Sequence, residues 1–254
     1  MHPIYALWAH PRSMSTATER IMRERGDLDC LHEPFMYDYY VHRKLRDLPG
    51  FEVQPDHPKD YEAIRDMILS RAEAGPVFFK DMSYYVMPRI LGDADFLDRL
   101  QNMFLIRRPR AAILSYRKLD PDLTVEEIGL AAQLRHVEGL RALGRPVTVL
   151  RAEDLRADPE GMMQALWSAV GLPFSARAFE WQRSEAPGDW AQVQDWHGAV
   201  MGSTGIRPPD PDAERRESEA FDAAAAEDSR LRDLLPPHES AWRALSAIAL
   251  TPSG

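Results

Sequence analysis

The chain has 254 residues, of which 44% are hydrophobic and 28% charged, a composition typical of a globular protein with a sizeable core. Its formal net charge of −9 disfavours a general nucleic-acid binder, because binding to phosphate backbones needs a basic surface. The single cysteine, Cys30, excludes a disulfide within the chain, and no apolar run reaches the roughly 18 residues of a membrane span. With no signal-like N-terminus, these features predict a cytoplasmic protein with one domain over residues 1–254.

Short apolar runs alternate with amphipathic helical patterns along the chain. We expect strands at residues 4–9, 28–31, 76–79, 103–106 and 146–150, and helices at 17–25, 60–74, 110–118, 124–143 and 159–170. This alternation predicts an α/β fold with three layers, in which helices flank a central parallel sheet of about five strands. Ligands of such sheets bind at the carboxyl ends of the strands, so the residues after each apolar run are the first candidates for a site.

The turn after the first expected strand is rich in hydroxyl groups and reads Pro11-Arg12-Ser13-Met14-Ser15-Thr16. It lacks the glycines and the Lys-Ser/Thr pair of the ordinary nucleotide-binding loop. Backbone amides at a helix N-terminus, together with the guanidinium of Arg12, favour a tetrahedral oxyanion. The alternative is an ordinary turn whose hydroxyl groups cap the helix, with Thr16 and Glu19 as a capping box.

A second basic turn follows the fourth expected strand. In "FLIRRPRAAILSYRKL", Arg107 ends the strand, Pro109 begins a helix and Ser115 lies on that helix. An arginine at a strand end and a hydroxyl group on the next helix can hold one phosphate from two sides. Alone, these arginines would be interpreted as a solvent-exposed basic turn. The two motifs together, in this order and separation, favour an anion site.

Both motifs resemble those of the sulfotransferases that use 3′-phosphoadenosine 5′-phosphosulfate (PAPS). The first turn is similar to the family loop P-[KR]-S-G-[ST]-T, which binds the 5′-phosphosulfate, and Arg107, Pro109 and Ser115 match R-x-P-x-x-x-x-x-S, which binds the 3′-phosphate. A third segment, "LRAEDLRADPEGMMQALWSAVGLP", extends the likeness over about residues 4–175. The set "PRSMSTATE", "HEPF", "KDM" and "IRRPRAAILS" resembles a bacterial and plant branch of sulfotransferase-like proteins.

The resemblance implies transfer of a sulfuryl group from PAPS to a hydroxyl group (or an amine) of a small-molecule acceptor. The product is 3′-phosphoadenosine 5′-phosphate (PAP), no metal is required, and neither nucleic acid nor a membrane is an expected partner, although a homodimer is compatible with this reading. The residues implied for the co-substrate are Arg12, Ser13, Met14, Ser15, Thr16, Arg107, Ser115, Ser203, Thr204 and Gly205. Met14 replaces a family glycine that would suit a positive φ. Ala152 replaces an aromatic residue that contacts adenine in many members.

The resemblance also implies where the general base lies. In cytosolic members a strand ends in Lys-Thr-His, whereas this chain has Lys80-Asp81-Met82, and a thioether cannot accept a proton. Other branches use a glutamate after the second strand, and Glu33 stands there, 21 residues beyond Arg12. Partial burial would raise the pKa of such a carboxyl toward neutrality. The alternatives are a structural ion pair, for instance with Arg12, or His32 as the base, although His32 should point the other way in an extended segment.

Lys80 is expected to stabilise the charge that develops on the departing nucleotide, and Arg12 to do the same at the sulfate. The alternatives for Lys80 are a side chain that extends to solvent or an ion pair with Asp81. On the acceptor side we expect a group of tyrosines, and a later segment, "DWAQVQDWHGAVMGSTGIRPPDP", is expected to return over the site. That group is Tyr37, Tyr39, Tyr40, Tyr84 and Tyr85.

Two other functions compete with this interpretation. A P-loop kinase or phosphotransferase shares the fold, and Asp81 would then bind magnesium, but the G-K-[ST] signature is absent. A non-catalytic nucleotide-binding protein of the same fold would tolerate the departures at Met14 and Ala152.

Overall fold

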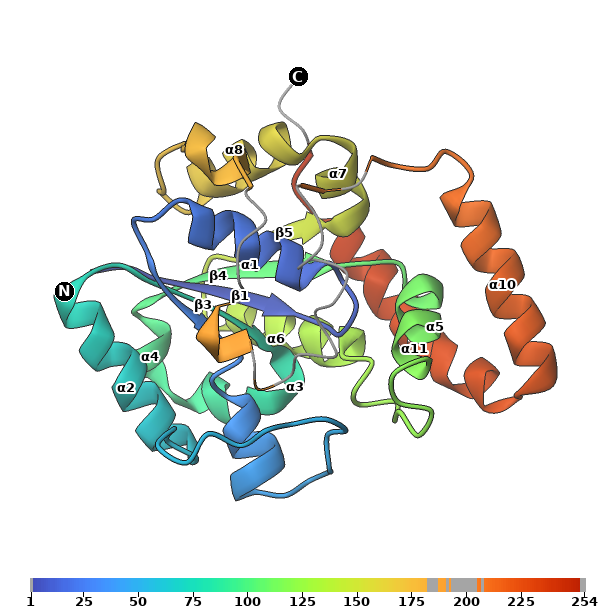
Figure 1. Ribbon diagram of the computed structural model, residues 1–254, viewed down its shortest axis with the longest axis horizontal. Coiled ribbons are helices and arrows are strands. Elements are labelled where there is room, and N and C mark those ends of the chain that lie inside the picture. The colour runs from blue at the N-terminus through green and yellow to red at the C-terminus, as the bar shows by residue number, and fades with distance from the viewer. Residues whose placement is uncertain (1, 182–186, 191, 193–204, 207, 252–254) are drawn as a thin grey trace.

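The described residues of the computed structural model form an α/β fold around a parallel sheet (Figure 1), as predicted. The structure describes residues 2–181, 187–190, 192, 205–206 and 208–251. Five strands lie in the order β2-β3-β1-β4-β5. They are β1 (Ile4–Ala9), β2 (Asp29–His32), β3 (Val77–Met82), β4 (Leu100–Ile106) and β5 (Thr148–Arg151).

Burial on both faces explains why the central strands are almost wholly apolar. All six residues of β1 and all six of β3 are buried, as expected for a parallel sheet covered by helices on both sides. β1 pairs with β3 on one side and with β4 on the other. Strand β3 runs three residues beyond the predicted end, so that Lys80 lies within the strand, beside Leu7 of β1.

Helices cover the sheet in two layers. The longer helices are α1 (Ser15–Glu24), α2 (Tyr61–Ala74), α5 (Pro109–Arg117), α6 (Leu130–Ala142), α8 (Pro159–Ala169), α10 (Ala213–Glu227) and α11 (Arg230–Ser246). One face of the sheet packs against α2, α6 and α11, and the other against α1 and α8. A smaller apolar cluster joins α5, α10 and α11. The described residues thus form the expected three layers.

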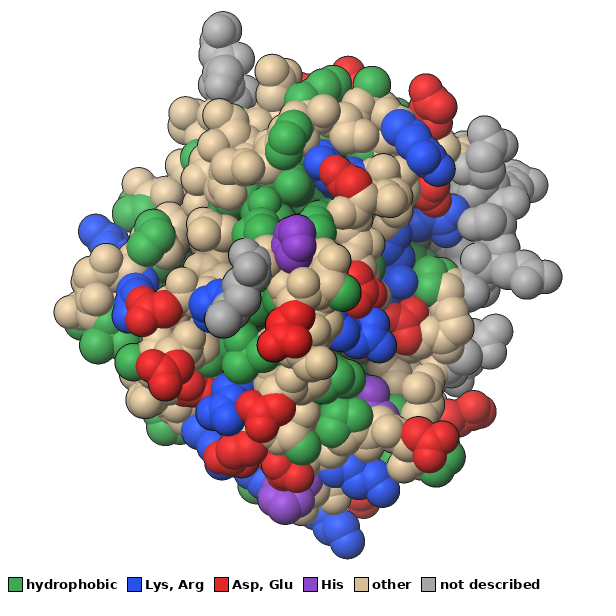
Figure 2. Space-filling model, turned by 90° about the vertical axis from the view of Figure 1, so that its left-hand side faces the viewer, with side chains coloured by type: hydrophobic (Ala, Val, Ile, Leu, Met, Phe, Trp, Pro, Cys, Tyr) green, Lys and Arg blue, Asp and Glu red, His purple; other side chains and the backbone are tan. Residues whose placement is uncertain are grey.

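Several short elements connect these layers. They are η1 (Tyr37–His42), α3 (Ser83–Val86), η2 (Arg89–Gly92), α4 (Ala94–Leu97), α7 (Ala152–Ala157) and η3 (Ala176–Phe179). None of the helices in the described part of the chain is long and apolar enough to cross a membrane. On the molecular face shown in Figure 2, basic and acidic side chains are interspersed.

Two predicted helix starts are wrong. Helix α1 begins at Ser15, and its N-cap is Met14, whose side chain makes no capping hydrogen bond. Thr16 therefore lies inside the helix and is not its N-cap, as the alternative with a capping box required. The helix predicted from residue 124 begins only at Leu130, because Gly129 has φ +84° and a Cβ there would lie 2.9 Å from that of His10.

Candidate active site

Two cavities lie beside the turn that follows β1. The first, which we call the tyrosine cavity, is lined by Pro11, Arg12, Ser15, Thr16, Glu33, Tyr40, Leu48, Met82, Tyr84, Tyr85 and Tyr116. The second, the arginine cavity, is lined by Met14, Arg107, Arg108, Ala152, Glu153, Arg156, Pro209, Asp210, Ala213 and Glu217. Residues of the same turn line both cavities, so the turn separates them.

The turn has a backbone shape suited to an anion. Arg12 and Met14 have φ +63° and +70°, on either side of Ser13, and such left-handed residues can turn successive N–H groups toward one point. Met14 therefore adopts the positive φ that the family's glycine would have favoured. Ser13 is fully buried, and its hydroxyl oxygen has no hydrogen-bond partner among the described residues. An orphaned donor at this point fits a bound oxyanion.

The two arginine motifs meet at this turn. The Nε of Arg12 donates to the Oγ of Ser115 at 2.9 Å, and the Nη1 of Arg107 donates to the carbonyl oxygen of Arg12 at 3.0 Å. Burial and the nearby Arg107 lower the pKa of Arg12. Two cations placed close together repel each other, and a bound anion relieves that repulsion, so such pairs are typical of anion sites. The structure therefore brings Arg12, Arg107 and Ser115 together.

The arginine cavity is partly neutralised by helix α10. Glu217 accepts from Arg107 at 3.1 Å and lies 3.3 Å from Arg108. Burial and Arg107 lower the pKa of Arg156, which lies in the same wall. Ala152 also lines the cavity, where its small side chain leaves room. Three arginines, Arg107, Arg108 and Arg156, therefore line the cavity together with three carboxylates, those of Glu153, Asp210 and Glu217.

Glu33 and Lys80 form a buried ion pair at the inner end of the tyrosine cavity. Glu33 lines the cavity, and its Oε1 accepts from the Nζ of Lys80 in a short contact. Lys80 is only 1% exposed and lies behind Glu33, with Glu19 at 3.8 Å, so it does not pair with Asp81. The hydroxyl of Tyr85 donates to the other oxygen of Glu33 at 3.3 Å.

His32 and Glu33 point toward the same cluster, so the expectation from strand alternation is wrong. β2 ends at His32, and Glu33 has φ +43°, which turns its side chain back toward the strand. The Nε2 of His32 then lies 3.8 Å from the Oε1 of Glu33. Positive φ in a residue with a side chain is uncommon, and such strain gathers at functional sites.

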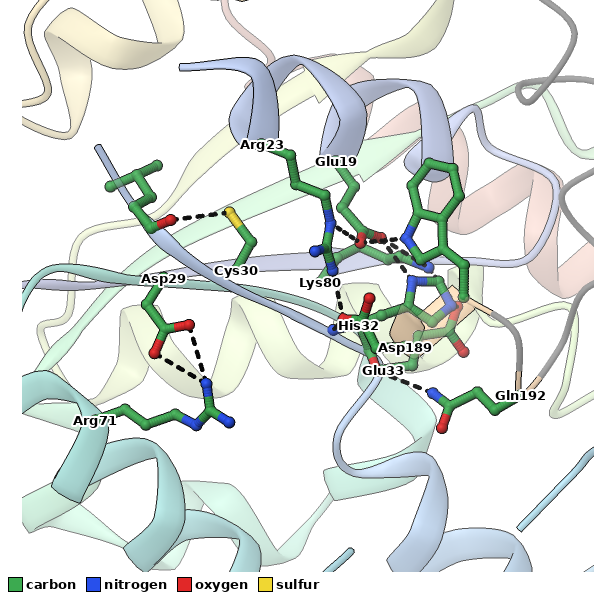
Figure 3. A network of polar contacts seen from close by, with 12 residues as sticks. Glu19, Arg23, Asp29, Cys30, His32, Glu33, Arg71, Lys80, Asp189 and Gln192 are labelled. Atoms are coloured by element: carbon green, nitrogen blue, oxygen red, sulfur yellow. Dashed lines mark hydrogen bonds and ion pairs between the residues drawn. The ribbon is translucent and has the colours of Figure 1, made fainter. Parts of the chain in front are cut away.

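A polar network lies behind this pair (Figure 3), and sequence reasoning missed its centre, Glu19 of α1. Glu19 is fully buried and accepts from His32 Nδ1 at 2.7 Å, from Arg23 Nε at 2.8 Å and from Trp190 Nε1 at 2.7 Å. Burial alone would raise the pKa of Glu19, but the nearby charges and hydrogen bonds lower it. The signal in the sequence that could have identified Glu19 is its position as an acidic residue on the face of α1 that packs against the sheet.

The segment predicted to return over the site does so in the part that the structure describes. Asp189 accepts from the backbone N–H of His32 at 3.1 Å and from Arg23 at 2.5 Å. Gln192 donates to the carbonyl oxygen of His32 at 3.3 Å. These contacts hold the end of β2 from the outside.

Three of the five predicted tyrosines line the tyrosine cavity: Tyr40, Tyr84 and Tyr85. Tyr116, which the sequence analysis did not single out, also lines it. Tyr37 instead donates its hydroxyl to Gln192 at 2.8 Å, and Tyr39 packs against neighbouring tyrosine rings. Burial raises the pKa of Tyr40, Tyr84 and Tyr85, so this wall carries neutral phenols.

The remaining predicted residues fall elsewhere. Ser203 and Thr204 lie outside the described residues, and Gly205 lines a third cavity with Asp158, Pro159 and Glu160 at the start of α8. Within the described ranges, no group of three or more His, Cys, Asp or Glu side chains is arranged to hold a metal ion.

Comparison with known proteins identifies the family. A family model for a sulfotransferase domain matches residues 4–226, so the chain belongs to the sulfotransferase family. Two solved structures share its fold. The sulfotransferase domain from the Synechococcus PCC 7002 olefin synthase has a TM-score of 0.55 and 18% sequence identity, and the match covers 89% of this chain and 94% of that one. The sulfotransferase domain from the curacin biosynthetic pathway has a TM-score of 0.52 and 16% sequence identity, and the match covers 89% of this chain and 97% of that one. At these identities the likeness extends to the fold alone.

Two Arabidopsis thaliana proteins are similar in sequence. Branched-chain-amino-acid aminotransferase-like proteins 2 and 1 are each 27% identical to this chain, over 214 and 216 residues. The alignments cover 82% and 80% of this chain but 37% and 36% of the plant proteins. The chain thus spans little more than a third of the length of these relatives.

Proposed function

We propose that this sulfotransferase uses PAPS as donor and transfers its sulfuryl group to a hydroxyl group (or an amine) of a small-molecule acceptor. The observation that carries the proposal is the position of one turn between two cavities. In this turn the side chain of Arg12 is hydrogen-bonded to Ser115, and its carbonyl oxygen accepts a hydrogen bond from Arg107. Such an arrangement fits a donor whose nucleotide lies in the arginine cavity and whose sulfate lies at the turn, next to the tyrosine cavity.

Each residue has a distinct role in the proposed reaction. The orphaned hydroxyl of Ser13 and the guanidinium of Arg12 suit the sulfate end, while Arg107 and Arg156 suit the phosphate of the nucleotide. The acceptor oxygen forms a bond to sulfur as the bond from sulfur to the phosphate oxygen breaks. Glu33 takes the acceptor's proton. Lys80, which the sequence analysis expected to act on the departing nucleotide, instead contacts Glu33 and holds its carboxylate in place.

The structure does not support the alternative that the protein is a kinase. Its magnesium ligand would be Asp81, but this carboxyl is fully buried and accepts from the backbone amides of Phe35 at 2.8 Å and Met82 at 3.1 Å. Burial and the charge of Glu33 raise the pKa of Asp81, which disfavours the ionised form that a metal needs.

A thermal-shift comparison of PAP, AMP and ATP with magnesium tests the proposal. PAP should stabilise the protein by about 2.7 kcal/mol at a hundredfold excess over its Kd, and AMP far less, because only PAP has a 3′-phosphate for Arg107. The Arg107→Ala variant should lose this difference, whereas Arg135→Ala, whose partner Glu126 is half exposed, should keep it. Equal shifts with PAP and AMP, or a larger one with ATP and magnesium, would contradict the proposal.

A further inference from the structure

The buried residues behind Glu33 form a chain of proton-binding groups. His32 Nδ1 lies 2.7 Å from Glu19 Oε2, and His32 Nε2 lies 3.8 Å from Glu33 Oε1. Glu19 comes from α1 and His32 from the end of β2 (Figure 3). Glu33 alone of the three lines the tyrosine cavity, so the order from the cavity inward is Glu33, His32, Glu19.

The position of Glu19 orients the imidazole. An ionised carboxylate accepts hydrogen bonds only, so the ring nitrogen facing Glu19 must carry a proton. In a neutral His32 the other nitrogen, Nε2, then presents its lone pair toward Glu33. Trp190 and Arg23 donate to the other oxygen of Glu19 and hold the carboxylate in this orientation. The arrangement is that of a carboxylate orienting a histidine base.

More carboxylates than cations surround His32. Three carboxylates face it, Glu19, Glu33 and Asp189, against two cations, Lys80 and Arg23. With a neutral imidazole this group therefore carries one net negative charge. The other nearby groups are neutral or turned away: the hydroxyl of Tyr85 donates to Glu33, and Asp81 accepts from backbone amides.

We infer that Glu19 and His32 form a proton relay that takes the acceptor's proton from Glu33, an inference that rests on the proposed function. The acceptor's O–H bond breaks and its proton binds Glu33; the proton then moves from Glu33 to His32 Nε2. The resulting imidazolium is stabilised by Glu19, and Glu33 regains the negative charge that pairs with Lys80. After the product leaves, the proton returns through Glu33, which borders the cavity, to solvent. His32 and Glu19 are thus positioning and relay residues, and Glu33 remains the group that touches the acceptor.

The lysine explains why a relay is useful. A protonated Glu33 beside the ammonium of Lys80 is unfavourable, because the ion pair is lost in a buried site. Passing the proton inward restores that pair, and it places the positive charge between two carboxylates, those of Glu19 and Glu33.

Nuclear magnetic resonance of the full chain with ¹⁵N-labelled histidine tests the protonation state without any acceptor. The His32 signal is identified by its loss in His32→Gln. We expect a neutral Nδ1–H tautomer at pH 8 that gains a proton as the pH is lowered. In Glu19→Gln the midpoint should fall by at least one pH unit, whereas Glu24→Gln, which changes a pair with Arg20 on the same helix, should leave it unchanged. A His32 that stays doubly protonated to pH 9, or is protonated on Nε2 when neutral, overturns the relay.

Hydrolysis of PAPS, with water as the probe acceptor, tests the catalytic consequence. His32→Gln should lower turnover by about 10²-fold and remove one ionisation from the pH dependence of kcat, while the Kd for PAP stays within twofold. His42→Gln, at an exposed position, is the control. A folded His32→Gln enzyme with unchanged turnover and pH profile overturns the relay alone. Failure of the unsubstituted protein to bind PAP would overturn the proposed donor, while the resonance experiment would still report on Glu19 and His32.

Discussion

Glu33 combines a strained backbone with a buried ion pair, and these two features define what a substitution there should do. The Glu33→Gln side chain keeps the shape and can still accept from Lys80, but it cannot take a proton. We expect transfer to fall by about 10²–10⁴-fold, the usual contribution of general-base catalysis, with PAP affinity nearly unchanged. PAPS turnover and calorimetric PAP binding measure the two effects.

The control for that substitution is Glu126→Gln, which changes an ion pair with Arg135 on the surface. It should alter neither quantity. If Glu33→Gln loses PAP binding or folding while turnover per folded molecule is unchanged, Glu33 is a structural partner only.

Lys80 should contribute to stability as well as to chemistry. Lys80→Met leaves the carboxylates of Glu33 and Glu19 buried without their ammonium, which we expect to lower the free energy of unfolding by about 3–5 kcal/mol. The double variant Lys80→Met/Glu33→Gln should recover part of that loss, because one uncompensated charge is then removed. Denaturant unfolding of the two single variants and the double variant measures this coupling. If the losses in the free energy of unfolding of the two single variants simply add up in the double variant, Lys80 and Glu33 do not stabilise each other.

At the scale of elements, helix α10 places a carboxylate where the nucleotide phosphate is expected. Glu217 pairs with Arg107 and Arg108, and only Phe221 and Ala225 of this helix are buried. Because the side chain of Glu217 is 23% exposed, its ion pairs are worth about 1 kcal/mol or less. Glu217→Gln should therefore raise PAP affinity by up to about fivefold.

Calorimetric titration with PAP checks this expectation at constant ionic strength. Asp222→Asn is the matched control, since it removes a pair between α10 and Arg110 of α5. Weaker PAP binding in Glu217→Gln would mean that Glu217 holds Arg107 in place for the ligand instead of competing with it.

At the scale of the whole molecule, buried histidines should make the fold sensitive to acid. Burial lowers the pKa of His10 and His136 to about 3 and that of His238 to about 4. In the unfolded chain these groups titrate near 6.5, so between pH 6.5 and about 3 the unfolded state binds more protons. The free energy of unfolding should therefore decrease as the pH falls below about 6.5, by up to about 1.4 kcal/mol per pH unit for each histidine. The raised pKa of Asp81 acts in the opposite direction.

Denaturant unfolding at pH 7.5 and pH 5.0 measures that dependence. His136→Gln should reduce the decrease in the free energy of unfolding between these two pH values by about 2 kcal/mol, because His136 packs between Trp8 and Phe104 and is fully buried. The exposed His42→Gln should keep the slope of the unsubstituted protein. A slope that is identical in all three would contradict the assignment of acid sensitivity to buried imidazoles.

Features that depend on neighbours in the chain were predictable from the sequence. The apolar runs predicted the five strands, and the motifs at two strand ends predicted an anion site at the edge of the sheet where Arg12, Arg107 and Ser115 lie close together. These predictions succeed because parallel strands must present their carboxyl ends at one edge of the sheet. Helix α11 escaped prediction because it continues through Pro236 and Pro237, where local rules would end it.

The chemical arrangement of the site was decided only by tertiary structure. The sequence by itself determined the family, the fold and the presence of an acidic residue at the end of β2. It did not determine that Glu33 turns back into a left-handed conformation or that Glu19 is buried against His32. Both depend on charges contributed by segments far apart in the chain, and a buried carboxylate is tolerated only where those partners converge.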